Sequence, residues 1–329
     1  MDEYRCTRPS GVLRGEAGLA IDCHDDFIFA ECGLEATYVT PLVRGGETVG
    51  ANGFPWQVAI FKKKGEEFEQ ICGGSLVRST LVITAAHCFS LSICPLTNKY
   101  FIINKTIYQK KLQVRAVRLE ERYGGHERNY QDDIALVQLK TEFNFSRAVR
   151  TVCLDLVDEE LDNTQTSPGS LGKVAGWGLT DSDKVSDVLK FLRVRVVGDK
   201  QCMEQLLIPS IHMASFITSD KLCAGLNNGS AVCPGDSGAG LVFPLHNTSI
   251  NLPRWYLRGV LSNAPTSHDL ANPGMCNYSN TFLSMFCCYK YRYKFVNNAF
   301  TYGNNAFTYG NNIFSMIGSI KVIKLNLTV

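Results

Sequence analysis

The sequence lacks a strong excess of charge of either sign. Among its 329 residues, 33 are Lys or Arg and 31 are Asp or Glu, which gives a formal net charge of +2. Nucleic acids and anionic membrane surfaces are bound through concentrated positive charge. We therefore expect neither nucleic acid nor a membrane among the partners of this chain.

Long hydrophobic runs and metal-binding cysteine pairs are also missing. No run reaches the roughly 18 apolar residues of a membrane-spanning helix, and the opening MDEYRCTRPS has neither the basic nor the apolar region of a signal peptide. We expect a signal and further modules to precede this chain. The cysteines do not form the close CxxC pairs with nearby histidines that zinc sites use, so no metal or other cofactor is expected.

Cysteine itself is abundant, with 13 residues spread along the chain. Such a number is unusual in a reducing compartment and indicates disulfides formed in an oxidising one. Acceptor tripeptides of the Asn-x-Ser/Thr type agree with secretion and glycosylation. They begin at Asn104, Asn144, Asn228, Asn247, Asn277 and Asn326. We expect a secreted, extracellular protein.

From about residue 55, short segments rich in β-branched and aromatic residues alternate with turn signals. The segments are WQVAIF, SLVRSTLVITAA, KLQVRAVRL, DIALVQL, GKVAGWG, KFLRVRVV and WYLRGVLSN. This pattern predicts an all-β fold. Spacing alone leaves open whether the strands form a sandwich or a barrel.

Three separated segments supply a histidine, an aspartate and a serine: TAAHC with His87, DDIALVQL with Asp133, and GDSGAG with Ser237. A serine hydroxyl is a poor nucleophile until a base removes its proton. His87 is the candidate base, and Asp133 is the candidate group that orients the imidazole and stabilises its cation. The glycines fit a tight turn in which the N–H groups of Gly235 and Ser237 would bind a developing oxyanion.

These segments, with CGGSL at 72–76 and GWG at 176–178, resemble the chymotrypsin and trypsin family of serine endopeptidases in order and spacing. The resemblance covers about residues 32–286. It implies two six-stranded antiparallel β-barrels with the active site in the cleft between them. Asp132 and Asp133 both precede the IAL run, and the family's aspartate is the adjacent Asp133, so we expect Asp132 to be solvated.

The same resemblance implies disulfide pairs and domain limits. The implied pairs are Cys32–Cys153, Cys72–Cys88, Cys202–Cys223 and Cys233–Cys276, which leaves Cys6, Cys23, Cys94, Cys287 and Cys288 unassigned. We divide the chain into part of a small disulfide module (1–31), an activation linker (32–42), a protease domain (43–286) and a low-complexity tail (287–329) that contains NNAFTYG twice.

Members of this family are made as inactive precursors, and LVRGGETVGANGFPWQV resembles their activation segment. Hydrolysis between Leu42 and Val43 would free an ammonium that pairs with Asp236 and orders the oxyanion turn. A rival cut after Arg44 shortens the free end by two residues, about 7 Å of extended chain. We therefore expect a zymogen that is activated by a cut before Val43.

In this family the residue six positions before the nucleophile forms the floor of the primary specificity pocket, and an aspartate there selects Arg or Lys. Here that residue is Ala231. An arginine would be buried without a counter-ion, whereas a leucine gains about 1.5 to 3 kcal/mol from burial. The residues assigned to the pocket are Ala231, Val232, Ser262 and Ala264. We expect cleavage after medium-sized apolar residues such as Leu42.

The segment GVLSNAP at 259–265, with the apolar pocket floor, is similar to the insect modular serine proteases. That resemblance implies a haemolymph enzyme acting early in a Toll or melanisation cascade, with downstream protease zymogens as protein substrates. The alternative is a catalytically inactive homologue that serves as a binding or scaffold partner. The intact triad argues against this alternative, and the atypical tail argues for it. The sequence does not determine the oligomeric state.

Overall fold

A computed structural model describes most of the chain between residues 53 and 263 and shorter segments outside it. The described residues are 12–14, 20–22, 32–35, 47–48, 53–89, 99–105, 111–155, 159–179, 184–208, 211–212, 217–226, 232–246, 252–263 and 282–288. In this part of the chain no helix is long and apolar enough to cross a membrane. The expected tail after Cys288 lies outside the described residues.

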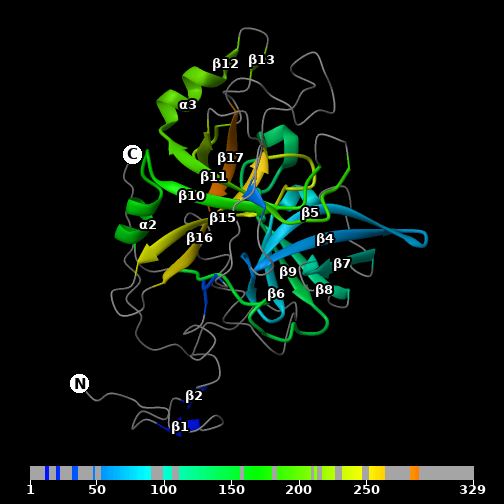
Figure 1. Cartoon of the computed structure of the whole chain (residues 1–329). Helices are drawn as coiled ribbons and strands as arrows, with labels where there is room; N and C mark the ends of the chain where they lie inside the picture. The colour runs from blue at the N-terminus through cyan, green and yellow to red at the C-terminus, as the bar shows by residue number, and fades with distance from the viewer. Residues whose placement is uncertain are drawn as a thin grey trace.

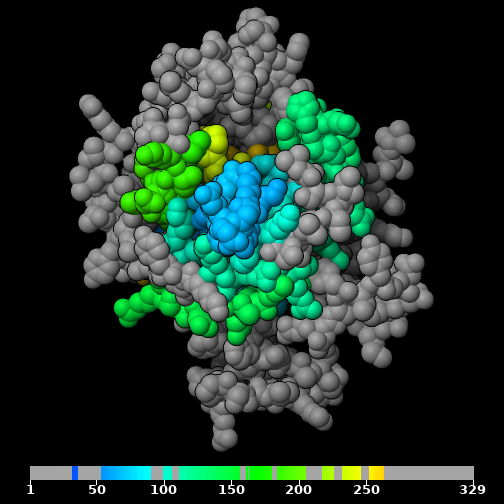
Figure 2. All heavy atoms as spheres, turned by 90° about the vertical axis from the view of Figure 1, so that its right-hand side faces the viewer, coloured from blue at the N-terminus to red at the C-terminus, as the bar shows by residue number. Residues whose placement is uncertain are grey.

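The first of two barrels is a closed sheet of six strands in the order β4-β5-β6-β9-β8-β7. Its strands are β4 (Gln57–Lys64), β5 (Glu67–Arg78), β6 (Leu81–Thr84), β7 (Tyr100–Ile103), β8 (Leu112–Leu119) and β9 (Ala135–Leu139). Every pairing is antiparallel. The hairpin of β4 and β5 projects from this barrel (Figure 1) and occupies the centre of the face shown in Figure 2.

The second barrel is built from a sheet in the order β10-β15-β16-β17-β14-β11-β3, which an additional pairing of β10 with β11 closes. Its strands are β10 (Leu171–Gly176), β11 (Lys190–Val197), β14 (Lys221–Leu226), β15 (Gly240–His246), β16 (Pro253–Asn263) and β17 (Phe282–Cys288), with β3 (Glu47–Thr48) added at β11. The two barrels lie side by side, the first on the right in Figure 1. The prediction of two six-stranded barrels is confirmed.

Short elements connect and cover the barrels. They are the helices α2 (Glu159–Gln165) and α3 (Asp199–Leu206), the single turns η1 (Ala86–Cys88) and η4 (Gly125–Arg128), and the hairpins β1 (Val12–Arg14) with β2 (Ala20–Asp22) and β12 (Leu207–Ile208) with β13 (Ile211–His212). The seven sequence segments expected to be strands all lie at strands of the two barrels. Their composition was a sufficient signal because barrel strands are buried on the inner face.

The larger hydrophobic cluster joins the two barrels. It combines Trp56 and Ile60 of the first barrel with Trp177, Trp255 and other buried residues of the second. In β11, charged residues alternate with the buried Val194 and Val196, which is the period-two pattern of a strand with one buried face. The shared core fixes the loops of one barrel relative to those of the other.

Three of the four expected disulfides are present: Cys32–Cys153, Cys72–Cys88 and Cys202–Cys223. Cys233 is disulfide-bonded, and its expected partner Cys276 lies outside the described residues. The Cys233–Cys276 pairing therefore stays a prediction.

Candidate active site

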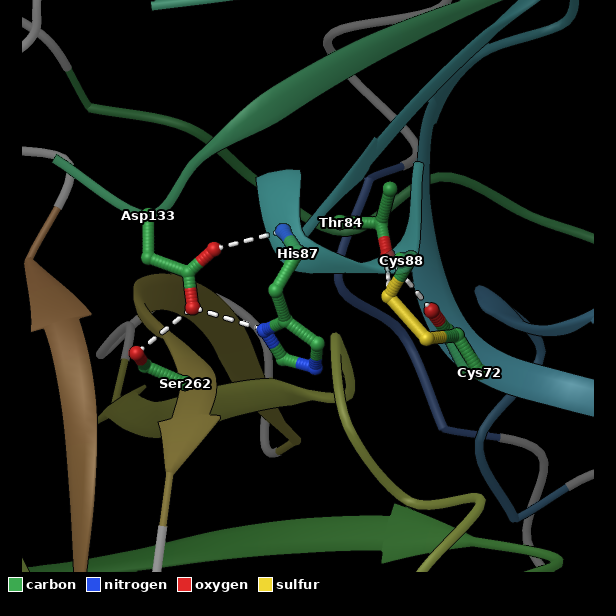
Figure 3. The surroundings of a disulfide bond; sticks show 7 residues. Cys72, Thr84, His87, Cys88, Asp133 and Ser262 are labelled. Carbon is green, nitrogen blue, oxygen red and sulfur yellow. Dashed lines mark hydrogen bonds and ion pairs between the residues drawn. A yellow bond between two sulfur atoms is a disulfide. The ribbon is translucent and has the colours of Figure 1, made fainter. Parts of the chain in front are cut away.

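His87 lies in η1, directly after strand β6 of the first barrel. The Cys72–Cys88 disulfide ties this turn to β5, and the Thr84 hydroxyl donates a hydrogen bond to the Gly73 carbonyl at 2.7 Å (Figure 3). Alanines precede the histidine, and Ala85 and Ala86 are both fully buried. The backbone that carries His87 is therefore held by the disulfide, the hydrogen bond and the core.

Asp133 lies in the loop between η4 and β9 and faces His87 (Figure 3). Its Oδ1 accepts a hydrogen bond from the His87 backbone N–H at 2.8 Å, and its Oδ2 lies 2.8 Å from His87 Nδ1. A carboxylate only accepts, so the ring hydrogen belongs on Nδ1, and Nε2 remains able to accept a proton. The geometry gives His87 the tautomer that a general base requires.

The Ser262 hydroxyl donates a 2.6 Å hydrogen bond to Asp133 Oδ2, although 129 positions separate the two residues. Ser262 belongs to β16 of the second barrel. Burial by itself raises the pKa of the Asp133 carboxyl, but the charge of His87 and the hydrogen bonds from His87 and Ser262 outweigh it and hold the pKa below its usual value. Asp133 therefore remains ionised at neutral pH.

Ser237 lies in the turn that leads into β15 of the second barrel. The Gly73 N–H donates to the Ser237 carbonyl at 2.7 Å, which joins this turn to β5. Gly238 has φ +82°, and a Cβ there would collide with Thr84 Oγ1 and come within 3.2 Å of the Ala85 nitrogen. Glycine at 238 thus lets the serine turn pack against the segment that carries His87.

The N–H groups of Gly235 and Ser237 make no hydrogen bond to other residues within the described part of the chain. Gly235 has φ +93°, which disfavours any residue with a side chain. Among the described residues, a Cβ at this glycine would meet Gly178 Cα at 3.4 Å and Gln70 Nε2 at 3.8 Å and nothing closer. The need for glycine here comes from the backbone angle rather than from crowding by the protein.

The Asp236 carboxylate points towards the GWG segment at the end of β10. Its Oδ1 accepts from the Gly178 N–H at 2.7 Å, and its Oδ2 accepts from the Cys233 N–H at 3.0 Å. A Cβ on Gly176 or on Gly178 would overlap the carboxylate oxygens. The two glycines of this motif therefore make the space that Asp236 occupies, a role that the sequence did not reveal.

Burial raises the pKa of the Asp236 carboxyl from 3.8 to about 6, although the N–H groups of Cys233 and Gly178 and the charge of Lys190 act in the opposite direction. A carboxyl whose folded pKa exceeds its unfolded value stabilises the fold at low pH and loses that contribution as the pH rises through about 6. The uncut chain is thus destabilised by ionised Asp236 at neutral pH.

We expect Asp236→Asn to remove this pH dependence. Both proteins are compared in the uncut Ser237→Ala background. The free energy of unfolding with Asp236 intact, minus that of the Asp236→Asn variant, should fall by about 2 to 3 kcal/mol between pH 4 and pH 7. Urea unfolding of both proteins at pH 4 and pH 7 measures this difference in the free energy of unfolding. Taking the difference at each pH cancels the titration of the other groups, and comparing the two differences cancels the pH-independent effect of losing one acceptor. A difference that does not change with pH would contradict the raised pKa.

The expectation that Asp132 is solvated is wrong. Asp132 is fully buried, and its Oδ2 lies 3.6 Å from Arg122 Nε. Its backbone N–H donates to Asp220 Oδ2 at 2.9 Å. Being next to a strand end predicts exposure for a charged residue, but here a segment of the second barrel covers the loop.

The remaining expected site residues are only partly described. Val232 is partly buried and packs against the smaller core cluster of the second barrel, whereas Ala231 and Ala264 lie outside the described residues. Ser262, assigned to the pocket from the sequence, places its hydroxyl on Asp133. Leu42 and Val43 of the expected activation bond also lie outside the described residues.

Two contacts of His87 and Asp133 had no local sequence signal. One is the Ser262 hydroxyl described above, and the other is Tyr130, whose ring lies edge-on to the His87 ring at 6.0 Å between centroids.

Among the described residues, the one cluster with the side chains of a metal site is Cys72, His87 and Cys88, and the two cysteine sulfurs are joined in a disulfide. They are therefore not thiolate ligands.

The chain is similar to many known proteins, among them the three that follow. The chain is 29% identical to "Modular serine protease" of Drosophila melanogaster over 83% of this chain and 42% of that protein, and 29% identical to "Clotting factor C" of Tachypleus tridentatus over 85% of this chain and 29% of that protein. It is 27% identical to "Phenoloxidase-activating factor 1" of Holotrichia diomphalia over 74% and 68% of the respective chains. The chain thus spans less than half the length of the first two.

A protein-family model described as Trypsin matches residues 43–285. The matched region includes the first barrel, the second barrel up to residue 285 in β17, the His87–Asp133 pair and the Ser237 turn. The chain therefore belongs to the trypsin family of serine proteases.

Proposed function

We propose that this chain is the catalytic part of a secreted serine endopeptidase zymogen that hydrolyses protein substrates. The observation that carries the proposal is the pair of hydrogen bonds between Asp133 and His87, beside a glycine-lined turn that presents Ser237. In this mechanism His87 Nε2 takes the Ser237 proton as the hydroxyl attacks the carbonyl carbon, and later gives it to the leaving amine. The N–H groups of Gly235 and Ser237 stabilise the oxyanion.

The proposed switch is a cut between Leu42 and Val43, after which the Val43 ammonium pairs with Asp236. Strand β3 supports this because Thr48 pairs with Lys190 of β11, and the Lys190 charge acts on Asp236. Val43 lies four positions before Glu47, and this stretch of chain spans at most about 14 Å. A partner ammonium would lower the raised pKa of Asp236 and offset the cost of its burial.

The proposed preference is for medium-sized apolar residues before the cleaved bond, because Ala231 puts no charge at the pocket floor. An arginine guest would lack a counter-ion, while a leucine gains about 1.5 to 3 kcal/mol. Cleavage of a peptide library should show Leu or similar residues before the cut. In Ala231→Asp, Arg and Lys should become the favoured residues, and an unchanged profile would contradict this pocket.

The proposed place of the enzyme is early in an extracellular Toll or melanisation cascade, with downstream protease zymogens as substrates. Relatives named as a modular serine protease, a clotting factor and a phenoloxidase-activating factor support a cascade role. Three disulfides support an oxidising, extracellular compartment. The second candidate, an inactive homologue acting as a binding partner, is retained because of the atypical sequence after Phe286.

One experiment tests both the activity and the switch. The purified precursor is incubated alone beside its Ser237→Ala variant, new amino termini are sequenced, and a serine-directed phosphonate is added. We expect a Val43 terminus and a labelled Ser237 in the unmodified chain, because Leu42 suits its own pocket. Neither should occur in the variant.

The two parts of the proposal fail in different ways. A Val43 terminus in the Ser237→Ala variant, or none in either protein, contradicts self-activation only. A chain that has been cut before Val43 by an added protease, remains folded by circular dichroism and stays unlabelled is not an endopeptidase. That result would favour the inactive homologue.

A further inference from the structure

The backbone just before Asp133 is left-handed at three residues that are not glycine. The φ angles are +53° at Asn129, +55° at Tyr130 and +63° at Asp132, and no other non-glycine residue in the described ranges has a positive φ. Asn129 is the C-cap of η4, a position where a left-handed Asn is common, whereas a bulky residue such as Tyr130 rarely adopts this conformation. Local hydrogen bonds, such as the one from the Tyr130 N–H to the Gly125 carbonyl, hold the start of the loop, and its end beside Asp133 is held by contacts outside the loop.

Those contacts come from the second barrel, at the start of β14. The Asp132 N–H donates to Asp220 Oδ2 at 2.9 Å, and Lys221 Nζ donates to the Asn129 carbonyl at 3.2 Å. Asp220 is 2% exposed and Lys221 is 7% exposed, which is uncommon for charged side chains. Both hydrogen bonds fall on left-handed residues of the loop.

The holding segment is itself ordered by internal hydrogen bonds. The Thr218 hydroxyl donates to Asp220 Oδ1 at 2.6 Å, and the Lys221 N–H donates to the Thr218 carbonyl at 2.9 Å. We call residues 218–221 the clamp. With both carboxylate oxygens bound, Asp220 has a fixed position from which to receive the Asp132 N–H.

The clamped loop makes three contacts with His87. Asp133 supplies two of them through its carboxylate, and the Tyr130 ring supplies the third. Other titratable or charged groups also lie around the loop: Arg122 faces Asp132 at 3.6 Å and Glu120 at 3.7 Å, and the His126 ring lies 5.9 Å from Tyr130. A displacement of the loop would alter all three of these contacts, two of which are made with the His87 ring.

We propose that Thr218, Asp220 and Lys221 are positioning residues for the catalytic centre. By holding the strained loop from the second barrel, they set the position of Asp133 relative to His87. The clamp also joins the barrel that carries Ser237 to the loop that carries Asp133. This inference rests on the proposed endopeptidase function, and it predicts loss of kcat rather than a rise in KM, because the clamp bonds to the Asp133 loop.

The test compares Asp220→Ala with Asp220→Asn and Thr218→Val in the cut enzyme. Ser219→Ala is the matched control, because Ser219 belongs to the same segment and is exposed. Asp220→Ala should lower kcat by about 10- to 100-fold, as displaced catalytic groups do. Asp220→Asn keeps an oxygen acceptor for the Asp132 N–H and should recover part of the loss, and Thr218→Val should lose about fivefold, the effect of one net hydrogen bond.

Two readouts distinguish positioning from simple stabilisation. In Asp220→Ala the acidic limb of kcat/KM against pH should move to lower pH by about half a unit or more, because a displaced Asp133 no longer favours protonated imidazole. In the inactive Ser237→Ala background, the downfield proton resonance of the His87–Asp133 hydrogen bond should weaken or broaden. This second readout needs no activity.

A lower melting temperature with unchanged kcat, pH profile and proton resonance in Asp220→Ala would overturn the proposal. So would equal losses in Asp220→Ala and Ser219→Ala. If Asp220→Ala does not fold, the proposal is tested with Asp220→Asn and Thr218→Val by the same measurements of kcat, pH profile and proton resonance. If the unmodified enzyme proves inactive, the proposed function fails, while the proton resonance still tests the clamp.

Discussion

Asp133→Asn should lower kcat by about 10⁴-fold at neutral pH, a magnitude taken from the general serine-protease template. The carboxylate accepts hydrogen bonds at both oxygens, from the His87 backbone N–H and from the Nδ1 side of the ring. An amide would present its NH₂ group at one of these positions. If it faces Nδ1, the ring hydrogen moves to Nε2, which can then no longer accept the Ser237 proton.

The measurement is kcat on a peptide with leucine before the cut, using enzyme cleaved before Val43. Ser262→Ala is the control, because it removes one hydrogen bond to Asp133 Oδ2 and leaves the charge and the ring contacts. We expect this control to lose about 10-fold, since a hydrogen bond to a charged group is worth about 1.5 kcal/mol or more. A folded Asp133→Asn variant with kcat within about 10-fold of the unmodified enzyme would show that another group orients His87.

Replacing both Cys72 and Cys88 by serine should lower the free energy of unfolding by about 3 kcal/mol in the chain-entropy description. The bridge spans 16 positions and holds the turn that carries His87 against β5. We expect kcat to fall as well, by about 10-fold or more, because His87 loses a constraint on its backbone. Urea unfolding gives the stability, and peptide hydrolysis gives kcat.

The Cys32–Cys153 bridge offers a control in which stability and activity should separate. It spans 121 positions, so its removal should cost more stability, about 5 kcal/mol. The backbone of Cys153 pairs with that of Tyr256 in β16 as an isolated β-bridge. Neither cysteine contacts His87 through a described hydrogen bond. A Cys32→Ser/Cys153→Ser variant that keeps kcat would support a local role for Cys72–Cys88, and equal losses of kcat in both variants would contradict it.

The sequence by itself determined the all-β class and the His87, Asp133 and Ser237 segments. These features are readable because each depends on a short segment: strand composition, a histidine beside a cysteine, or a serine between glycines. The two barrels and the three disulfides were implied by the family resemblance. The order of the segments along the chain added the family resemblance. Together, the segments and their order predicted which residues meet in the active site. They did not predict which other residues surround each side chain.

Only the tertiary structure decided the environments of these residues. Asp132 is buried because the segment at the start of β14 covers its loop. Asp133 accepts a hydrogen bond from the hydroxyl of Ser262, which lies 129 positions away in the sequence. The glycines of GWG are required because Asp236 occupies the space beside them. Burial and these hydrogen-bond partners arise from contacts between segments distant in sequence, so no local pattern could have predicted them.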